Sequence, residues 1–316
     1  MEDVTAAGPL LSVLLVGGVL AAGVLTLTLL DAALSAAIAG GGWWRSVAGE
    51  TFGRAALVWQ QRGTITERPD VTLWLLAPGF YGACAAAAVA VVPVAEGIAA
   101  ADVRTGIVVF GAVEVLTMVA VYVHGWSANS YLSLIGGYRF LAVVFSTLLI
   151  SMFVLIGAAL PAESLSFGAI VDSQATLWNV VRQPLGLPLW LAVGLATAFW
   201  GPFQLADAAD LAGGTSAETS GPHRLAWAAA RRAMLVAYAV AGAAVFLGGH
   251  HGPWLPGWLW MALKSIAVLT LLLASGHLAG RWRAERVVTV AWTVLLPASF
   301  VHLVEAGSVA LLASGG

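Results

Sequence analysis

The chain alternates long apolar stretches with shorter polar connections. Most of the apolar stretches approach or exceed the roughly 20 residues that a helix needs to cross the hydrocarbon core of a bilayer. Helices are expected because a segment in lipid must satisfy its own backbone hydrogen bonds. The pattern therefore predicts an all-α polytopic membrane protein with about eight transmembrane helices. The expected helices cover about 9–30, 73–95, 106–124, 138–160, 186–203, 232–249, 258–280 and 287–313.

These helices are expected to form a single membrane domain over residues 1–316, with no soluble domain. No internal repeat is visible, which argues against a transporter built from inverted repeats. Two connections are long, 31–72 after the first helix and 204–231 after the fifth. Within the first of them, residues 51–62 have the pattern of an amphipathic helix that lies at the membrane surface.

The start of the chain does not resemble a cleaved signal peptide. Glu2 and Asp3 precede the first apolar segment, where a signal peptide carries basic residues. The first segment is also long enough to remain as a membrane anchor. We therefore expect it to be the first transmembrane helix.

Composition excludes several classes of protein. Sixty per cent of the residues are hydrophobic and 9% are charged, which no ordinary water-soluble domain of 316 residues shows. A formal net charge of −2 predicts no nucleic-acid partner. Cys84 is the one cysteine, so neither a disulfide framework nor a metal cluster held by thiolates is expected on this chain.

Basic residues gather in alternate connections. Eleven of the 14 Lys and Arg residues fall on one predicted side of the membrane. By the positive-inside rule, the long loops face the cytoplasm and both termini face outward, in a multi-pass protein of the cell (inner) membrane. The eleven are Arg45, Arg54, Arg62, Arg68, Arg139, Arg224, Arg231, Arg232, Arg281, Arg283 and Arg286.

Three charged residues interrupt apolar segments, namely Glu114, Lys264 and Glu305. A charge at the centre of a bilayer costs about 2.5–3.5 kcal/mol on insertion scales, so such residues usually face the bundle interior and mark a pathway. We predict that Glu114 and Lys264 belong to a proton path. The alternatives are that Glu114 is kept protonated by burial and that Glu305, near a helix end, reaches the interface.

Two polar segments carry further candidates. One runs from Gly125 to Arg139 between apolar stretches, and the other contains Asp207 and Asp210 and is followed by Glu218. The alternative for the first segment is an ordinary loop with a cytoplasmic arginine anchor. The carboxylates of the second segment either line a polar cavity or solvate a surface turn.

The six histidines are scattered along the chain. Only the adjacent pair His250 and His251 approaches a metal-ligand spacing, and it has the pattern of a solvated turn. No metal site is therefore expected on this chain.

Several short segments of the chain resemble the H subunit (subunit 1) of respiratory complex I. Residues 125–139 (GWSANSYLSLIGGYR) resemble the family's GWASNSKYALLGALR, and 202–208 (PFQLADA) resemble PFDLPEA. Residues 218–221 (ETSG) are similar to EYSG and 246–249 are FLGG, as in the family. Residues 66–70 (TERPD) stand in the place of PARAD, and the likeness continues through 292–297 (WTVLLP, beside GWKVLLP).

The resemblance implies a protein that anchors the hydrophilic electron-transfer arm to the membrane, helps to form a quinone chamber and begins a proton path. It implies that iron–sulfur clusters lie on partner subunits, that quinone binds at the interface, and that this chain binds no cofactor. The chamber and interface residues that it implies are Arg68, Arg139, Asp207, Asp210 and Glu218. Contacts with the arm or with lipid headgroups are expected from Arg281, Arg283 and Glu285.

The chain departs from the family pattern at positions where the family carries the ionisable residues of a proton path. Leu148 replaces a glutamate, Thr197 and Trp200 stand where a glutamate and an arginine are expected, Gln204 replaces an aspartate, and Arg231 stands where an acid is usual. Protons cannot pass through leucine and tryptophan unless water substitutes. The departures leave the docking role intact and weaken the expectation of ordinary quinone chemistry.

Two alternatives remain open. One is the anchor subunit of a membrane-bound hydrogenase of group 4, with iron–sulfur clusters and nickel on partner chains, or a divergent complex without normal quinone reduction. The other, from a different class, is a stand-alone transporter or scaffold.

Overall fold

The computed structural model describes residues 8–40, 47, 49 and 51–314. The charged residues Glu2, Asp3 and Arg45 lie outside this part of the chain. Within it the chain forms helices and short helical turns but no strand. The long helices are α1 (Pro9–Ile38), α4 (Val71–Ala90), α5 (Gly106–Ser127), α6 (Tyr131–Ala159), α10 (Gly221–Phe246) and α11 (Gly257–Leu278). A last long helix consists of α12 (Ala284–Val290), a π-helical turn (Ala291–Leu295) and α13 (Leu296–Ser314).

Among the described residues, seven helices are long and apolar enough to cross a membrane. The all-α polytopic prediction is thereby confirmed, and the chain is a multi-pass membrane protein. Four short helices complete the described secondary structure apart from 3-10 turns. They are α3 (Thr51–Gln60), α7 (Phe167–Asp172), α8 (Asn179–Arg182) and α9 (Gly186–Thr197).

The expected helix over 186–203 is much shorter than predicted. It forms α9, whose 12 residues rise about 18 Å, less than the roughly 30 Å of a hydrocarbon core. The chain leaves the helix because Phe199 and Gly201 adopt left-handed backbone conformations, with φ of 38° and 57°. Pro202 then lacks the N–H that a further helical turn would need. The C-terminal end of α9 therefore lies inside the bundle.

Two other helices begin earlier in the sequence than predicted. Helix α6 begins at Tyr131 rather than near residue 138, and α10 begins at Gly221 rather than near residue 232. The added turns of α10 carry Arg224 and Arg231, and the hydropathy pattern stops at such charges. The added turns of α6 carry no charge, but polar residues and glycines interrupt their apolar pattern. Both segments are helical in contact with the loop 198–220, as described below. The connection after α9 is correspondingly shorter than 204–231.

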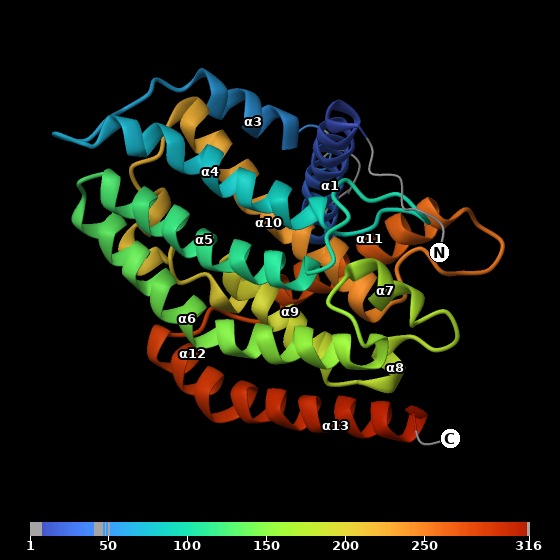
Figure 1. Ribbon diagram of the computed structural model, residues 1–316. Helices are drawn as coiled ribbons and strands as arrows, with labels where there is room; N and C mark the ends of the chain where they lie inside the picture. The colour runs from blue at the N-terminus through green and yellow to red at the C-terminus, as the bar shows by residue number, and fades with distance from the viewer. Residues whose placement is uncertain (1–7, 41–46, 48, 50, 315–316) are drawn as a thin grey trace.

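Helix α10 lies at the centre of the bundle and packs against α4, α11, α1 and α9 (Figure 1). Its second half is rich in alanine and glycine, which lets neighbouring helices approach closely. A Cβ atom on Gly242 would lie 2.8 Å from Trp190 Nε1, so this position has no room for a larger residue. Outward from α10, α5 packs on α4, α6 packs on α5, and α13 packs on α6 (Figure 1).

The connecting segments gather at the two ends of the bundle. The polar segment 61–70, the break between α5 and α6, and the loop 198–220 meet at one end, on the left of Figure 1. The loop 247–256, α7 and α8 lie at the other end, toward which α13 also runs. The helix expected within 51–62 is present as α3, in which no residue is buried. The first of these two ends is called the arginine-rich end below.

Candidate functional site

A large cavity opens at the arginine-rich end. Its volume is about 1290 Å³, and α1, α3, α10, α11 and the loop 198–220 line it. Side chains from α1 and α3 supply an apolar part of the wall. They include Leu25, Ala32, Ala36, Phe52, Leu57 and Val58.

Other parts of the wall are charged. His277 Nε2 of α11 lies 2.9 Å from Asp31 Oδ1 of α1, which connects two helices across the cavity. Most of the other charged lining residues are cationic. They are Arg54, Arg224, Arg231, Arg232 and Arg281, with Asp207 as a second carboxylate.

Asp207 and Arg231 form a buried ion pair at this wall. Arg231 Nη1 donates to Asp207 Oδ2 at 2.5 Å, and the side chains are 12% and 4% exposed for Arg231 and Asp207. Arg231 also donates from Nη2 to the carbonyl of Phe199 at 2.9 Å and lies 3.9 Å from the centre of the Phe199 ring. Asp207 accepts further hydrogen bonds from Thr215 at 2.5 Å and Ser216 at 2.6 Å. The unexpected arginine of α10 is thus the partner of a candidate carboxylate.

The same loop packs tightly on the start of α6. The hydroxyl of Ser133 donates to the carbonyl of Gly214 at 3.0 Å. Gly214 has a φ of 51°, and a Cβ atom there would lie 1.8 Å from the carbonyl oxygen of Ala206. A Cβ atom on Gly136 of α6 would lie 2.5 Å from the same oxygen. Only glycine fits at these contacts, so the two polar segments of the sequence are built to meet.

Three more candidate residues lie on the outer side of this contact. Arg139 of α6 and Asp210 form an ion pair of 2.7 Å with side chains 28% and 60% exposed. The hydrogen bond from Arg139 holds the pKa of Asp210 below its usual value. Glu218 accepts a hydrogen bond of 2.8 Å from Ser130, just before α6. The structure therefore brings Arg139, Asp207, Asp210 and Glu218 together around one loop.

The remaining surface candidates lie beside this cluster. Arg68 lines a smaller hollow of about 430 Å³, in a segment fixed by a hydrogen bond of 3.0 Å from Asn129 to the carbonyl of Glu67. Arg281 and Arg283 are exposed between α11 and α12, and Glu285 is exposed in the first turn of α12. The backbone of this connection is joined to the loop by a hydrogen bond of 3.2 Å from Trp282 to Pro202.

A second polar cluster surrounds Glu114 in the bundle interior. Ser151 of α6 donates to the Glu114 carboxylate at 2.6 Å, and the Tyr238 hydroxyl of α10 lies 2.5 Å from Glu114 Oε1. Tyr238 also lies 3.0 Å from the hydroxyl of Thr197, whose carbonyl accepts a 2.8 Å hydrogen bond from Tyr81 of α4. Five helices thus contribute to one buried network. The sequence analysis missed these hydroxyl groups, since single Tyr, Ser and Thr residues are common in apolar helices.

Lys264 does not share a hydrogen-bond partner with Glu114. Its ammonium group donates to the carbonyls of Gly249 at 2.9 Å and His251 at 2.5 Å, and it lies 4.3 Å from the centre of the Trp178 ring. These partners belong to the opposite end of the bundle. Glu305 has one buried carboxylate oxygen without a hydrogen-bond partner among the described residues. The structure thus separates Lys264 from the interior cluster.

The residues that depart from the family pattern fall in three places. Trp200 and Gln204 line the large cavity. Thr197 belongs to the Glu114 network. Leu148 is partly buried against the hydrophobic core. The substituted positions therefore contact the cavity, the network and the apolar packing, respectively.

The fold and these sites define a class: a polytopic membrane protein with a charged cavity at one end and a buried carboxylate network in its interior. A model of the NADH dehydrogenase family matches residues 56–306. The H subunit of the NADH-quinone oxidoreductase of Geobacillus kaustophilus is 33% identical over 246 residues, covering 76% of this chain and 74% of the relative. An H subunit of the Rhodopseudomonas palustris (strain HaA2) enzyme is 32% identical over 247 residues, covering 78% and 77%. The chain belongs to this family.

We predict that the two ion pairs differ strongly in their contribution to stability. Replacing Arg231 by Ala leaves Asp207 buried without its charge partner and should lower the free energy of unfolding by about 3–5 kcal/mol. Replacing Arg139 by Ala opens an exposed pair and should cost about 0–1 kcal/mol. Thermal unfolding of the two detergent-solubilised variants measures the difference. Equal losses of stability in the two variants would contradict this difference between the buried and the exposed ion pair.

Proposed function

We propose that this chain is the membrane-anchoring subunit of a complex of the NADH-quinone oxidoreductase type. In that complex it docks a hydrophilic electron-transfer arm, lines a chamber for quinone and begins a proton path. The large cavity at the arginine-rich end is the observation that carries the proposal. Family membership supports it, because the curated relatives carry the name of the H subunit of that enzyme.

The size and lining of the cavity suit a quinone. Pockets for small ligands usually have about 300–1000 Å³, and this one has about 1290 Å³. A quinone combines a long apolar tail with a polar redox headgroup. The apolar wall of α1 and α3 is suited to the tail, and the charged wall around Asp31 and His277 offers partners to the headgroup oxygens. Arginines near the headgroup would stabilise negative charge that develops during reduction.

The electrons come from partner subunits in this proposal. With Cys84 buried and alone, the chain offers no set of thiolates for an iron–sulfur cluster. The exposed polar groups around Arg139, Asp210 and Arg68 give the arginine-rich end a surface for the arm, and Arg283 and Glu285 extend it. In this assignment the arginine-rich end faces the cytoplasm of a cell membrane and both termini face outward.

The proton path runs through hydroxyl groups. Arg231 at the cavity wall binds the carbonyl of Phe199, two residues beyond Thr197. From Thr197 the hydroxyl of Tyr238 leads to Glu114 and on to Ser151. Thr197, Tyr238, Glu114 and Ser151 lie within hydrogen-bond distance of one another in this order and can exchange protons in sequence. Water would have to join Thr197 to the cavity wall, because no hydrogen bond among the described residues does so. Thr197 thus takes the place of an ionisable group, and Leu148 need not take part.

The experiment that tests the function is purification of the tagged chain from native membranes, with identification of the co-purifying subunits and assay of iron and nickel. We expect subunits rich in iron–sulfur clusters and no nickel. Nickel together with iron would instead assign the chain to a hydrogenase, the alternative that the loss of family acids at Leu148 and Gln204 favours. A chain that purifies alone and without iron or nickel would refute both assignments and favour a transporter or scaffold.

We predict that filling the cavity abolishes quinone reduction. Ala32 lines the cavity on α1, and an Ala32→Trp side chain would occupy the space of the tail. Quinone reduction by the complex should fall at least about tenfold, as for other losses of substrate positioning. Electron transfer from the arm to a water-soluble acceptor should be unchanged. The control is Ala37→Trp, at an exposed position of the same helix that does not line the cavity. Equal activity of the two variants would argue against the chamber.

We predict that Tyr238→Phe uncouples proton translocation from quinone reduction. The substitution removes the one hydroxyl between Thr197 and Glu114, while the ring can keep its packing. Proton uptake by sealed vesicles, measured per quinone reduced, should fall toward the passive leak. Tyr122→Phe is the matched control, because its hydroxyl bonds only Tyr138 among the described residues. Unchanged proton uptake in Tyr238→Phe would exclude this path.

A further inference from the structure

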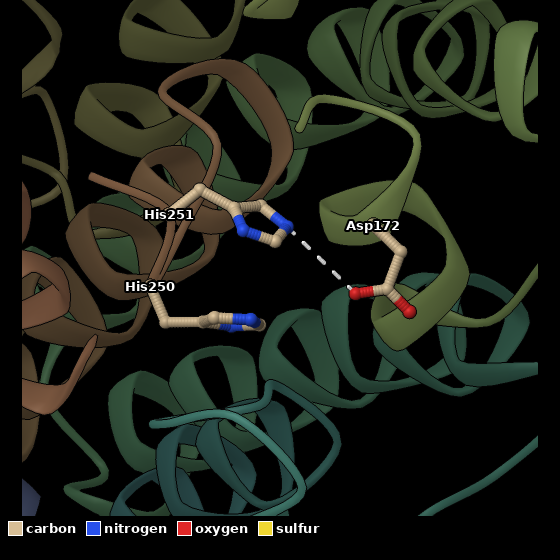
Figure 2. A group of neighbouring side chains, drawn as sticks. All are labelled: Asp172, His250 and His251. Carbon is tan, nitrogen blue, oxygen red and sulfur yellow. Dashed lines mark ion pairs between the residues drawn. The ribbon is translucent and has the colours of Figure 1, made fainter. Parts of the chain in front are cut away.

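The end of the bundle opposite the cavity holds a cluster of three metal-ligating side chains. Asp172 is the last residue of α7, and His250 and His251 lie in the loop between α10 and α11. Figure 2 shows both imidazoles and the carboxylate pointing toward a common space. One ligand atom from each residue lies within 4.8 Å of the others. We propose that Asp172, His250 and His251 bind a divalent transition-metal ion, with Zn²⁺ as the best match.

The two histidines have nitrogen atoms that lack partners. Nδ1 of His250 and Nε2 of His251 are buried and make no hydrogen bond among the described residues. His250 as a whole is 9% exposed. Buried polar atoms are normally paired, because a desolvated donor or acceptor without a partner costs free energy. Two such atoms on adjacent residues at one site indicate that a ligand supplies the missing partner.

The spacing fits a bound metal better than a direct contact. His251 Nε2 lies 3.8 Å from Asp172 Oδ1, which is too long for a hydrogen bond (Figure 2). Zinc binds nitrogen and oxygen at about 2.0–2.2 Å, so two ligands of a tetrahedral ion lie roughly 3.4 Å apart. A movement of a few tenths of an ångström by the exposed Asp172 side chain would bring this pair of atoms to that separation, and the other ligand atoms lie within 4.8 Å. Its exposure also leaves a coordination position open to water.

The backbone holds the histidine pair in place. Gly248 and Gly249 have φ values of 70° and 49°, and a Cβ atom on Gly248 would lie 2.7 Å from the Trp178 ring. His251 N–H donates to the carbonyl of Gly248 at 2.9 Å, which closes the turn. The loop is thus fixed before any ion binds.

The charges around the site set the affinity. Lys264 lies beneath the loop and binds its carbonyls, and its positive charge opposes a cation. Asp172 and Glu96 are the carboxylates whose charge reaches His250, and they offset this repulsion. Two imidazoles and one carboxylate form the donor set of many zinc sites with an open position, whereas Mg²⁺ and Ca²⁺ require mainly oxygen ligands. The site should therefore select zinc over magnesium and join α7 to the α10–α11 loop.

The test is zinc binding by the full chain in detergent, measured by equilibrium dialysis and elemental analysis after removal of metal with a chelator. One zinc ion should bind per chain, and equal magnesium should not displace it. Asp172→Asn and His251→Ala should each raise the zinc dissociation constant at least about tenfold. Asp172 is exposed, so Asp172→Asn tests the site even where His251→Ala impairs folding.

The matched control is Asp102→Asn, an exposed carboxylate outside the cluster, which should leave the zinc affinity unchanged. X-ray absorption of the zinc-loaded chain should show two imidazole ligands. No bound zinc, or equal affinity in the wild type and Asp172→Asn, would overturn the proposal. The result does not depend on quinone or proton chemistry, so this site and the proposed function can fail separately.

Discussion

The buried ion pair between Asp207 and Arg231 organises the arginine-rich end of the molecule. A charge in a low-dielectric interior is stable only when a partner and additional hydrogen bonds replace the water it has lost. Asp207 has Arg231, Thr215 and Ser216 as donors. Because Arg231 belongs to the central helix and Asp207 to the loop 198–220, the pair ties that loop to α10. The loop then forms one wall of the cavity and covers the first turns of α6.

The need to provide partners for buried polar groups also explains the hydroxyl network around Glu114. Helix α9 ends after 12 residues, so its last carbonyl groups lie inside the bundle without helical partners. The hydroxyl of Tyr81 satisfies the carbonyl of Thr197, and the side chain of Thr197 contacts Tyr238 beside Glu114. The short helix thus has a structural role. It places hydroxyl groups where a full membrane-spanning helix would place only apolar side chains.

Helices α10 and α11 connect the two ends of the bundle. One end of α11 carries His277, which meets Asp31 at the cavity, and Lys264 on the same helix binds the loop of His250 and His251. A metal ion at that loop would brace the turn between α10 and α11 against α7. The opposite ends of the same two helices contribute to the walls of the cavity. Rigidity at one end therefore supports the geometry of the other.

The sequence by itself determined the class of fold, the approximate position of seven membrane-length helices and the family. Apolar length and motif order are local properties of a chain, so they can be recognised without knowing which helices touch. Only the tertiary structure decided four other features. They are the pairing of Asp207 with Arg231, the hydroxyl network around Glu114, the approach of Asp172 to the loop of His250 and His251, and the early starts of α6 and α10. In each case the partner that stabilises a polar group lies on another helix, and no local pattern records which helix that will be.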